Sequence, residues 1–473
     1  MTEHMTLTDA SAALKAGEVT SVQLVQDAIA VADEHDAAVG MFLNRTNDQA
    51  LAAAETADAA LAAGGEVGPL HGMPLGIKDI ITTQEGVSTA QSLVLDPAWS
   101  DGDAVVVERL RAAGAIVMGK LTTMEYAIGM PDASKPFPIP RNPWNLDHWA
   151  GGSSSGSGSS VAAGAVLGAL GTDTGGSIRI PAAFCGITGL MPTFGRVPKS
   201  GCVPLGYTLD HIGPMTRSAR DCALMLGVMA GPHPSDPTTI DVPVDDYVGG
   251  LTGDLTGLRI GVDQLSRIAG DAEDPALPGT FAAAVAELEK LGAEIVEIEL
   301  PFYAEMSTAC MVMMVSEAMA YHLPDLQSRW SDYFEATRMT VGMGIYYSAA
   351  DYVQAQRARR VGQLALAKVF EDVDLIVTPT SGAGATSFDQ MSTFSDRMAE
   401  GGFGPIYTPY WDTTGNPVLS APMGFTQDGL PLSLQIAGRP FDETTVLRAG
   451  DAFQRVTDWH EQVPSLAAVA VPA

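Results

Sequence analysis

The chain has 473 residues, of which 46% are hydrophobic, so it is long enough to bury one or two large cores. Its formal charge of −30 gives a surface that repels phosphate backbones and anionic lipid. These properties exclude nucleic acid and membranes as expected partners and favour a small neutral or cationic molecule as the substrate.

The cysteines and the N-terminus carry no sign of secretion or of a metal site. Four cysteines in so long a chain do not form a disulfide framework, and their spacings match no zinc site. They are Cys185, Cys202, Cys222 and Cys310. The N-terminus lacks the basic and apolar segments of a secretory signal, and no uncharged apolar run is long enough to span a bilayer. We therefore expect a cytoplasmic protein with reduced thiols and no metal.

The first part of the chain, residues 1–68, is predicted to be a helical cover. Residues 6–63 show the spacing of two helices, a short strand and a third helix.

The next part is predicted to span residues 69–250 and to carry the catalytic residues. It opens with two buried strands, at 75–81 and 115–120, separated by a helix over 103–115. Strand, helix, strand at this spacing predicts a parallel βαβ unit.

The last part, residues 251–473, repeats this pattern and is expected to complete the sheet and the substrate pocket. Its predicted strands and helices, in order, are a strand at 258–264, a helix at 280–293, strands at 293–300, 374–380 and 431–438, and a closing amphipathic helix at 443–457.

Methionine and aromatic residues are concentrated between residues 305 and 360. They include Met311, Met313, Met314, Met339, Met343, Tyr346 and Tyr347. Such residues usually form a helical core, but Met-rich surfaces also suit adaptable apolar ligands. The same two interpretations apply to Met124, Tyr126, Met130 and Phe137, and both stay open.

The most unusual segment is the Gly/Ser run 151–160, which composition alone would call a flexible linker. The run leads without a break into an apolar segment, as a loop does when it opens a packed helix, and this disfavours a linker. Residues 152–156 also match the G-x-S-x-G elbow of α/β-hydrolase esterases. That motif needs a strand before it, and residues 142–150 do not have the pattern of one.

A second serine cluster, residues 171–177, has the pattern of a nucleophile beside an oxyanion hole. Two glycines directly before Ser177 let backbone N–H groups of Thr174, Gly175 and Gly176 turn toward one point. A serine hydroxyl is a weak nucleophile without a base. No lysine in the chain has a serine three residues before it, so the base must come from a distant segment.

Lys78 is the candidate base, because apolar residues fall on both faces of the run 75–81. A lysine on such a buried strand is desolvated, which lowers its pKa. To be half neutral near pH 7 the pKa must fall by about three units, at a cost of roughly 4 kcal/mol. Asp79 points to the opposite face and need not pair with it. The alternative is a lysine at a strand end that extends to water.

With these residues identified, the chain resembles the amidase signature family. The matching stretches are 69–80, 150–157, 171–190, 209–222 and 429–447. The resemblance implies an α/β fold with a mixed central sheet covered by helices on both faces. It also implies that Lys78 is the catalytic lysine, that Ser153 is the bridging serine after a cis peptide bond, and that Ser177 forms the acyl-enzyme. No cofactor is implied.

Two residues depart from the family's pattern. Ser155 stands where the family commonly has glycine, which matters only if the position needs a positive φ. Met191 replaces a common lysine. Neither is one of the three proposed catalytic residues.

The resemblance implies an amidase that cleaves a C–N acyl bond of a carboxamide, aryl amide or hydrazide, with a small apolar acyl group as the expectation. A homodimer is left open. The alternative within the family is the glutaminase subunit of a tRNA-dependent amidotransferase, which commonly has Gln where this chain has Ile180. That difference and the acidic charge argue against it. A catalytically silent scaffold is disfavoured by the intact Lys78, Ser153 and Ser177.

Overall fold

The computed structural model describes residues 4–99, 102–269, 273–391 and 405–466. Its centre is one mixed sheet of 11 strands in the order β1-β3-β2-β6-β8-β7-β12-β13-β11-β9-β10. The strands are β1 (Phe42–Arg45), β2 (Pro74–Lys78), β3 (Ile116–Leu121), β6 (Gly168–Asp173), β7 (Thr188–Met191), β8 (His211–Thr216), β9 (Arg259–Val262), β10 (Glu294–Glu297), β11 (Leu375–Pro379), β12 (Val418–Phe425) and β13 (Pro431–Gly438). The predicted α/β fold with a mixed sheet is confirmed.

Parallel pairs lie toward both ends of the sheet, and antiparallel pairs join them at its centre. Strands β2 and β3 run parallel and are connected through α4 (Val105–Ala112), as the predicted βαβ unit requires. Strands β9 and β10 repeat the arrangement through α9 (Leu277–Lys290). Both units are confirmed. One continuous sheet therefore takes strands from both predicted halves, and the division into three parts stays a prediction.

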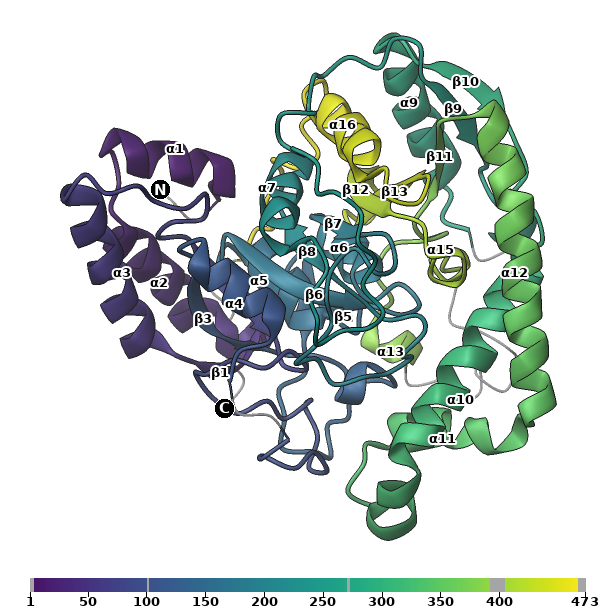
Figure 1. Cartoon of the computed structure of the whole chain (residues 1–473), viewed down its shortest axis with the longest axis horizontal. Coiled ribbons are helices and arrows are strands. Elements are labelled where there is room, and N and C mark those ends of the chain that lie inside the picture. The colour runs from purple at the N-terminus through teal and green to yellow at the C-terminus, as the bar shows by residue number, and fades with distance from the viewer. Residues whose placement is uncertain (1–3, 100–101, 270–272, 392–404, 467–473) are drawn as a thin grey trace.

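The N-terminal helices gather at one end of the molecule, shown in purple in Figure 1. They are α1 (Leu7–Ala16), α2 (Ser21–Val39) and α3 (Asn47–Ala62), with β1 between the last two. This order of elements is the predicted one. Two long helices, α10 (Tyr303–Arg329) and α12 (Ala349–Asp372), lie together at the opposite side, which makes the Met-rich block helical.

Shorter helices cover the centre of the sheet. They are α5 (Ser155–Ala163), α6 (Arg179–Cys185), α7 (Ala219–Met229), α15 (Pro409–Thr414) and α16 (Glu443–Gln454). The other elements of the described residues are α8 (Ser266–Ala269), α11 (Glu335–Gly342), α13 (Phe388–Met391), the hairpin strands β4 (Arg141–Asn142) and β5 (Asn145–Trp149), and two 3₁₀ turns, η1 (Glu125–Ala127) and η3 (Met343–Tyr346).

The central strands β7, β8 and β12 were not predicted, and glycine and proline explain why for β8 and β12. Strand β12 contains Pro422 and Gly424 with a bulge between them, and β8 contains Gly213 and Pro214. A Cβ at Gly213 would lie 2.1 Å from the carbonyl oxygen of Leu190, so this glycine permits a close approach of β8 to β7. Residues that signal a break in an isolated sequence therefore serve close packing inside this sheet.

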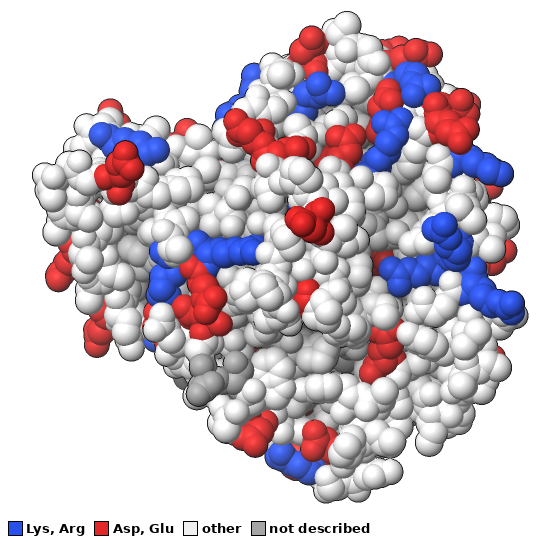
Figure 2. Space-filling model, viewed as in Figure 1, with Lys and Arg blue, Asp and Glu red and all other residues white. Residues whose placement is uncertain are grey.

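The surface charge does not collect in one place on the visible face. Figure 2 shows acidic side chains spread over the rim and interspersed with Lys and Arg. Within the described ranges, no helix is long and apolar enough to cross a bilayer.

Candidate active site

The first residues of the Gly/Ser run, 151–154, bend into α5, and residues 155–160 form the start of that helix, as the sequence predicted. Its residues are buried, and a Cβ at Gly156 would lie 2.4 Å from the carbonyl oxygen of Met41. Ser155 begins α5 without a positive φ, so its replacement of glycine causes no backbone strain. The linker interpretation is therefore wrong.

The segment before this run differs from expectation. Residues Asn145–Trp149 form strand β5, although the sequence pattern gave no strand there. Strand β5 forms a two-stranded sheet with β4, apart from the central sheet, and an isolated bridge joins its His148 to Ser387. It therefore does not supply the central strand from which an α/β-hydrolase elbow projects its serine.

Lys78 ends strand β2 with its side chain fully buried. Its Nζ donates hydrogen bonds to the hydroxyl oxygens of Ser153 at 2.8 Å and Thr172 at 2.7 Å. Burial lowers the pKa of Lys78 to about 7, against the opposing charges of Asp173 and Asp210. The predicted desolvation is present, and a proton can leave this ammonium near neutral pH.

Ser153 follows a cis peptide bond, Gly152–Ser153, as the resemblance implied. Its carbonyl oxygen accepts hydrogen bonds from the Thr123 hydroxyl at 2.8 Å and the Met124 N–H at 3.1 Å. These contacts leave its hydroxyl directed to Lys78. The next residue, Ser154, donates its N–H to the carbonyl oxygen of Ser177 at 3.2 Å, so the two serine segments are adjacent.

Ser177 lies at the end of the turn between β6 and α6 and is 9% exposed. The carboxylate of Asp173 accepts the N–H groups of Gly176 at 2.5 Å and Ile178 at 3.1 Å, on either side of the serine. The Gly176 N–H is thus engaged in the resting site, in contrast to the expectation that it faces the substrate. The N–H groups of Gly175 and Ser177 have no partner within the described ranges.

Ser153 and Ser177 line the same cavity of about 470 Å³. Among the described residues no hydrogen bond joins their two hydroxyl groups. The other lining residues are apolar or uncharged: Met124, Ala127, Ile128, Gly129, Trp149, Gly152, Gly175, Ile180, Leu205, Ser307, Thr308, Cys310, Met311, Met314, Met343, Tyr347, Ile406 and Pro409.

The sequence left open whether the Met and aromatic residues form the core or line the pocket, and the structure shows that they do both. Met311, Met314, Met343 and Tyr347 face the cavity, and so does Met124. The rest lie elsewhere. Met313, Tyr126 and Met130 are buried in hydrophobic clusters, Phe137 contacts Phe334, and Met339 and Tyr346 are exposed.

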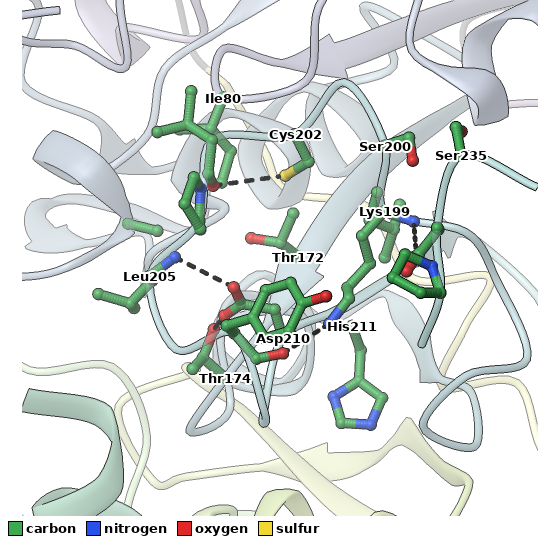
Figure 3. Close-up of a pocket in the computed structure, with 17 residues that line it drawn as sticks. Ile80, Thr172, Thr174, Lys199, Ser200, Cys202, Leu205, Asp210, His211 and Ser235 are labelled. Carbon is green, nitrogen blue, oxygen red and sulfur yellow. Dashed lines mark hydrogen bonds between the residues drawn. The ribbon is translucent and has the colours of Figure 1, made fainter. Parts of the chain in front are cut away.

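Figure 3 shows the residues that line a second, smaller cavity, of about 180 Å³. Thr172, which accepts a hydrogen bond from Lys78, is part of its wall, as are Cys202 and Asp210. Burial raises the pKa of the Cys202 thiol to about 12, so it stays neutral near Lys78. Lys78 thus contacts one hydroxyl group in the wall of each cavity, that of Ser153 in the larger and that of Thr172 in the smaller.

The sequence missed several residues that hold the site together. Thr172 and Asp173 lie in the serine-cluster segment but were not singled out. Arg179 contacts both Asp173 and Asp412, and the second contact joins residues 233 positions apart, which no local pattern reveals. In the described part of the chain, no group of three or more His, Cys, Asp or Glu side chains is arranged to hold a metal ion.

The chain is similar to known proteins over nearly its whole length. The sequence profile of the Amidase family matches residues 23–447. The A subunit of glutamyl-tRNA(Gln) amidotransferase from Roseiflexus sp. (strain RS-1) is 41% identical, over 98% of each chain. Peptide amidase from Stenotrophomonas maltophilia has 29% identity and a TM-score of 0.83, with 96% of this chain and 97% of that chain covered. The corresponding amidotransferase subunit from Thermotoga maritima has 27% identity and a TM-score of 0.82, with 99% of both chains covered.

The names of these relatives correct the expectation about partners. The sequence favoured a small-molecule substrate and no nucleic acid, whereas the curated relatives are subunits of an enzyme named for charged tRNA. That expectation is therefore wrong. It rested on the net charge of −30, which describes the surface of one chain and does not say what neighbouring subunits of an assembly hold.

Proposed function

The chain belongs to the amidase family, and on that premise we propose that it hydrolyses an amide C–N bond through an acyl-enzyme on Ser177. The observation that carries this proposal is the 2.8 Å hydrogen bond from buried Lys78 to Ser153. Burial leaves Lys78 a pKa of about 7, so a neutral amine is available beside a serine that shares its cavity with Ser177.

The reaction begins with proton transfer away from the nucleophile. Neutral Lys78 takes a proton from Ser153, Ser153 takes one from Ser177, and Ser177 Oγ attacks the amide carbonyl. The relay requires the Ser153 and Ser177 hydroxyls to meet during the reaction, as catalytic hydrogen bonds often do only with substrate bound. The oxyanion is assigned to N–H groups of the turn, with those of Gly175 and Ser177 available.

The same groups then release the nitrogen. The relay returns its proton to the amide nitrogen as the C–N bond breaks, because an amide anion is too basic to leave unprotonated. Water next loses a proton to the relay and attacks the acyl carbonyl, and the proton returns to Ser177 as the acid departs. No proton is gained or lost by the enzyme over the cycle.

We infer that the amide is that of glutamine and that the chain works as the A subunit of an amidotransferase. The support is the identity of 41% over 98% of both chains with a relative of that name. In this role the hydrolysis supplies ammonia to an assembly that acts on glutamyl-tRNA(Gln), and the acidic surface of this chain is compatible with partner subunits that hold the nucleic acid.

A second candidate function is hydrolysis of an amide with an apolar acyl group. The specific observation in its favour is that no described residue lining the cavity is charged. Glutamine carries an ammonium and a carboxylate, and burying either without a partner is costly. Ile180, Met311 and Met314 instead offer apolar contact.

Turnover and binding together separate the two functions. Ammonia release is measured for the purified chain with L-glutamine and benzamide, and binding of each is measured by calorimetry on Ser177→Ala. Tighter binding of glutamine supports the subunit role. Preferential binding and turnover of benzamide by the chain alone contradicts that role and supports the second function. Full turnover by Ser177→Ala contradicts the mechanism itself.

A further inference from the structure

Beneath the nucleophile turn, one buried arginine holds two carboxyl groups. The Nε and Nη2 groups of Arg179 donate to Asp173 at 3.0 and 3.1 Å, and Nη2 also donates to Asp412 Oδ2 at 2.6 Å. Its Nη1 donates to the Thr408 carbonyl at 3.0 Å and to Gln435 at 2.8 Å. All the N–H groups of this guanidinium are therefore used.

The charges in this cluster do not balance if both acids are ionised. The side chains of Asp173, Arg179 and Asp412 are all 0% exposed. The other titratable groups facing Asp412 are Cys310 on α10 and Arg359 on α12, and Arg359 donates to the Thr208 carbonyl at 3.0 Å. One contacting cation thus faces two carboxyls, and a second buried negative charge is costly.

The Oδ1 atom of Asp412 indicates which carboxyl group of the cluster carries a proton. Asp412 Oδ1 is buried and accepts no hydrogen bond from any residue that the structure describes. The same nitrogen, Arg179 Nη2, donates to Asp173 Oδ1 at 3.1 Å and to Asp412 Oδ2 at 2.6 Å, so the two carboxyl groups lie side by side. Two ionised carboxylates repel one another, whereas a protonated Asp412 donates to Asp173 and satisfies this atom. Burial and the charge of Asp173 accordingly raise the pKa of Asp412 well above its usual range.

The cluster is joined directly to the turn that presents Ser177. Asp173 accepts the N–H groups of Gly176 and Ile178 on both sides of the serine. Asp412 lies on α15, and Thr408, at the start of that helix, donates its hydroxyl to the Gly175 carbonyl at 2.6 Å. A Cβ at Gly176 would lie 2.0 Å from the same hydroxyl, so α15 packs tightly against the turn.

We propose that Asp412 is a positioning residue that stays protonated and donates a hydrogen bond to Asp173, which fixes the turn carrying Ser177. Asp412 contacts neither the cavity nor the reacting atoms and acts only through Asp173. The proposal rests on the proposed hydrolysis at Ser177, because its kinetic consequence is a loss of nucleophile placement.

The test compares two substitutions of Asp412 with a control on the same helix. Asp412→Asn keeps both hydrogen bonds, since its amide donates to Asp173 and its oxygen accepts from Arg179. Asp412→Ala removes both. Thr413→Val is the matched control, because Thr413 is buried on α15 but donates to Met306 on α10. The readouts are kcat and KM per folded molecule and the infrared carbonyl band of protonated acids at neutral pH.

We expect Asp412→Asn to lose one protonated-acid band relative to the native chain and to keep kcat within about twofold. Asp412→Ala should lower kcat by roughly tenfold or more with little change in KM, since misplacement of a nucleophile slows the chemical step. Thr413→Val should leave kcat unchanged.

An unchanged carbonyl band in Asp412→Asn, or a kcat in Asp412→Asn as low as in Asp412→Ala, overturns the proposal. Should Asp412→Ala fail to fold, the band and the kcat of Asp412→Asn still decide it. The band reports Asp412 directly, so it is independent of whether Ser177 is the nucleophile. Activity retained by Ser177→Ala instead refutes the proposed function.

Discussion

Two buried lysines on adjacent parallel strands have taken different roles in this molecule. Lys78 on β2 and Lys120 on β3 lie one register position apart and both have side chains that are 0% exposed. Lys78 Nζ contacts the hydroxyls of Ser153 and Thr172. Lys120 Nζ donates to the Ile81 carbonyl and the Ser88 hydroxyl, and lies 3.8 Å from the Asp79 carboxylate.

The difference shows what decides the use of a buried lysine. Burial lowers the pKa of both, to about 7 for Lys78 and about 8 for Lys120, and the charge of Asp79 opposes the shift in Lys120. A carboxylate partner favours a fixed cation that joins strand to loop. Ser153, the hydroxyl partner of Lys78, lines the cavity that holds Ser177 and can accept and return protons there. We therefore assign proton transfer to Lys78 and a structural role to Lys120.

The largest expected effect is that of Ser177→Ala, which removes the hydroxyl whose proton Lys78 accepts through Ser153. Activity on any accepted amide should fall on the order of 10⁴-fold or more, because no acyl-enzyme forms. Steady-state rates of amide hydrolysis measure this. Ser157→Ala is the matched control, since that serine is buried in α5 and bonds the Leu170 carbonyl at 2.8 Å. A similar loss in both variants would show that the effect is structural.

Lys78→Met should lower amide hydrolysis by roughly 1000-fold and ester hydrolysis by less, because an alkoxide leaving group needs less protonation than an amine. The ratio of kcat/KM for a matched amide and ester pair is the measurement. If Lys120→Met gives the same change in that ratio, the assignment of proton transfer to Lys78 and of a structural role to Lys120 is wrong.

The pH dependence should follow Lys78. Below its pKa of about 7 the amine is protonated and cannot accept a proton, so amide kcat/KM should fall by about tenfold per pH unit as pH drops below 7. Burial also raises the pKa of Glu125 to about 7, so this acid needs a control. This fall in kcat/KM below pH 7, the acidic limb of the pH profile, should persist in Glu125→Gln and in Lys120→Met. Its loss in either variant assigns the limb to another group.

The smallest effect on activity is expected for Lys120→Met, with kcat within about threefold of the native value. Its cost should appear in stability, because the change leaves the Asp79 carboxyl buried without a cation, a loss of roughly 3 kcal/mol in the free energy of unfolding. Denaturant titration measures this loss. Lys120→Met with Asp79→Asn should recover part of it, and no recovery would mean that the pair is not coupled.

The sequence predicted the environment of Lys78 better than its partners. The unbroken apolar run 75–81 indicated a buried strand, and the structure places the lysine at its end. Lys120 carries the same local signal at the end of 115–120, so burial on a strand does not by itself distinguish the two lysines. The two lysines differ in their partners: Lys120 lies beside the Asp79 carboxylate, and Lys78 contacts the Thr172 hydroxyl. The fold brings Thr172 to Lys78 from 94 positions away in the sequence.

The residues that were missed share this dependence on distant contacts. Asp412 contacts Arg179 from 233 positions away in the sequence, and the proline and glycine within β12, Pro422 and Gly424, hid that strand. The expectation about partners failed for another reason, because net charge reports on one chain and not on its assembly. Local pattern therefore predicted burial and secondary structure, while pairing across the sheet was beyond it.

The central claim is that Ser177 is the nucleophile and that Lys78, not Lys120, prepares it. Reaction of the native chain with a serine-directed fluorophosphonate, followed by peptide mass mapping, tests this most directly. The account predicts a single adduct on Ser177, whose rate of formation falls sharply in Lys78→Met and is retained in Lys120→Met. An adduct on Ser153 instead, or equal labelling of Ser177 in both lysine variants, would contradict it.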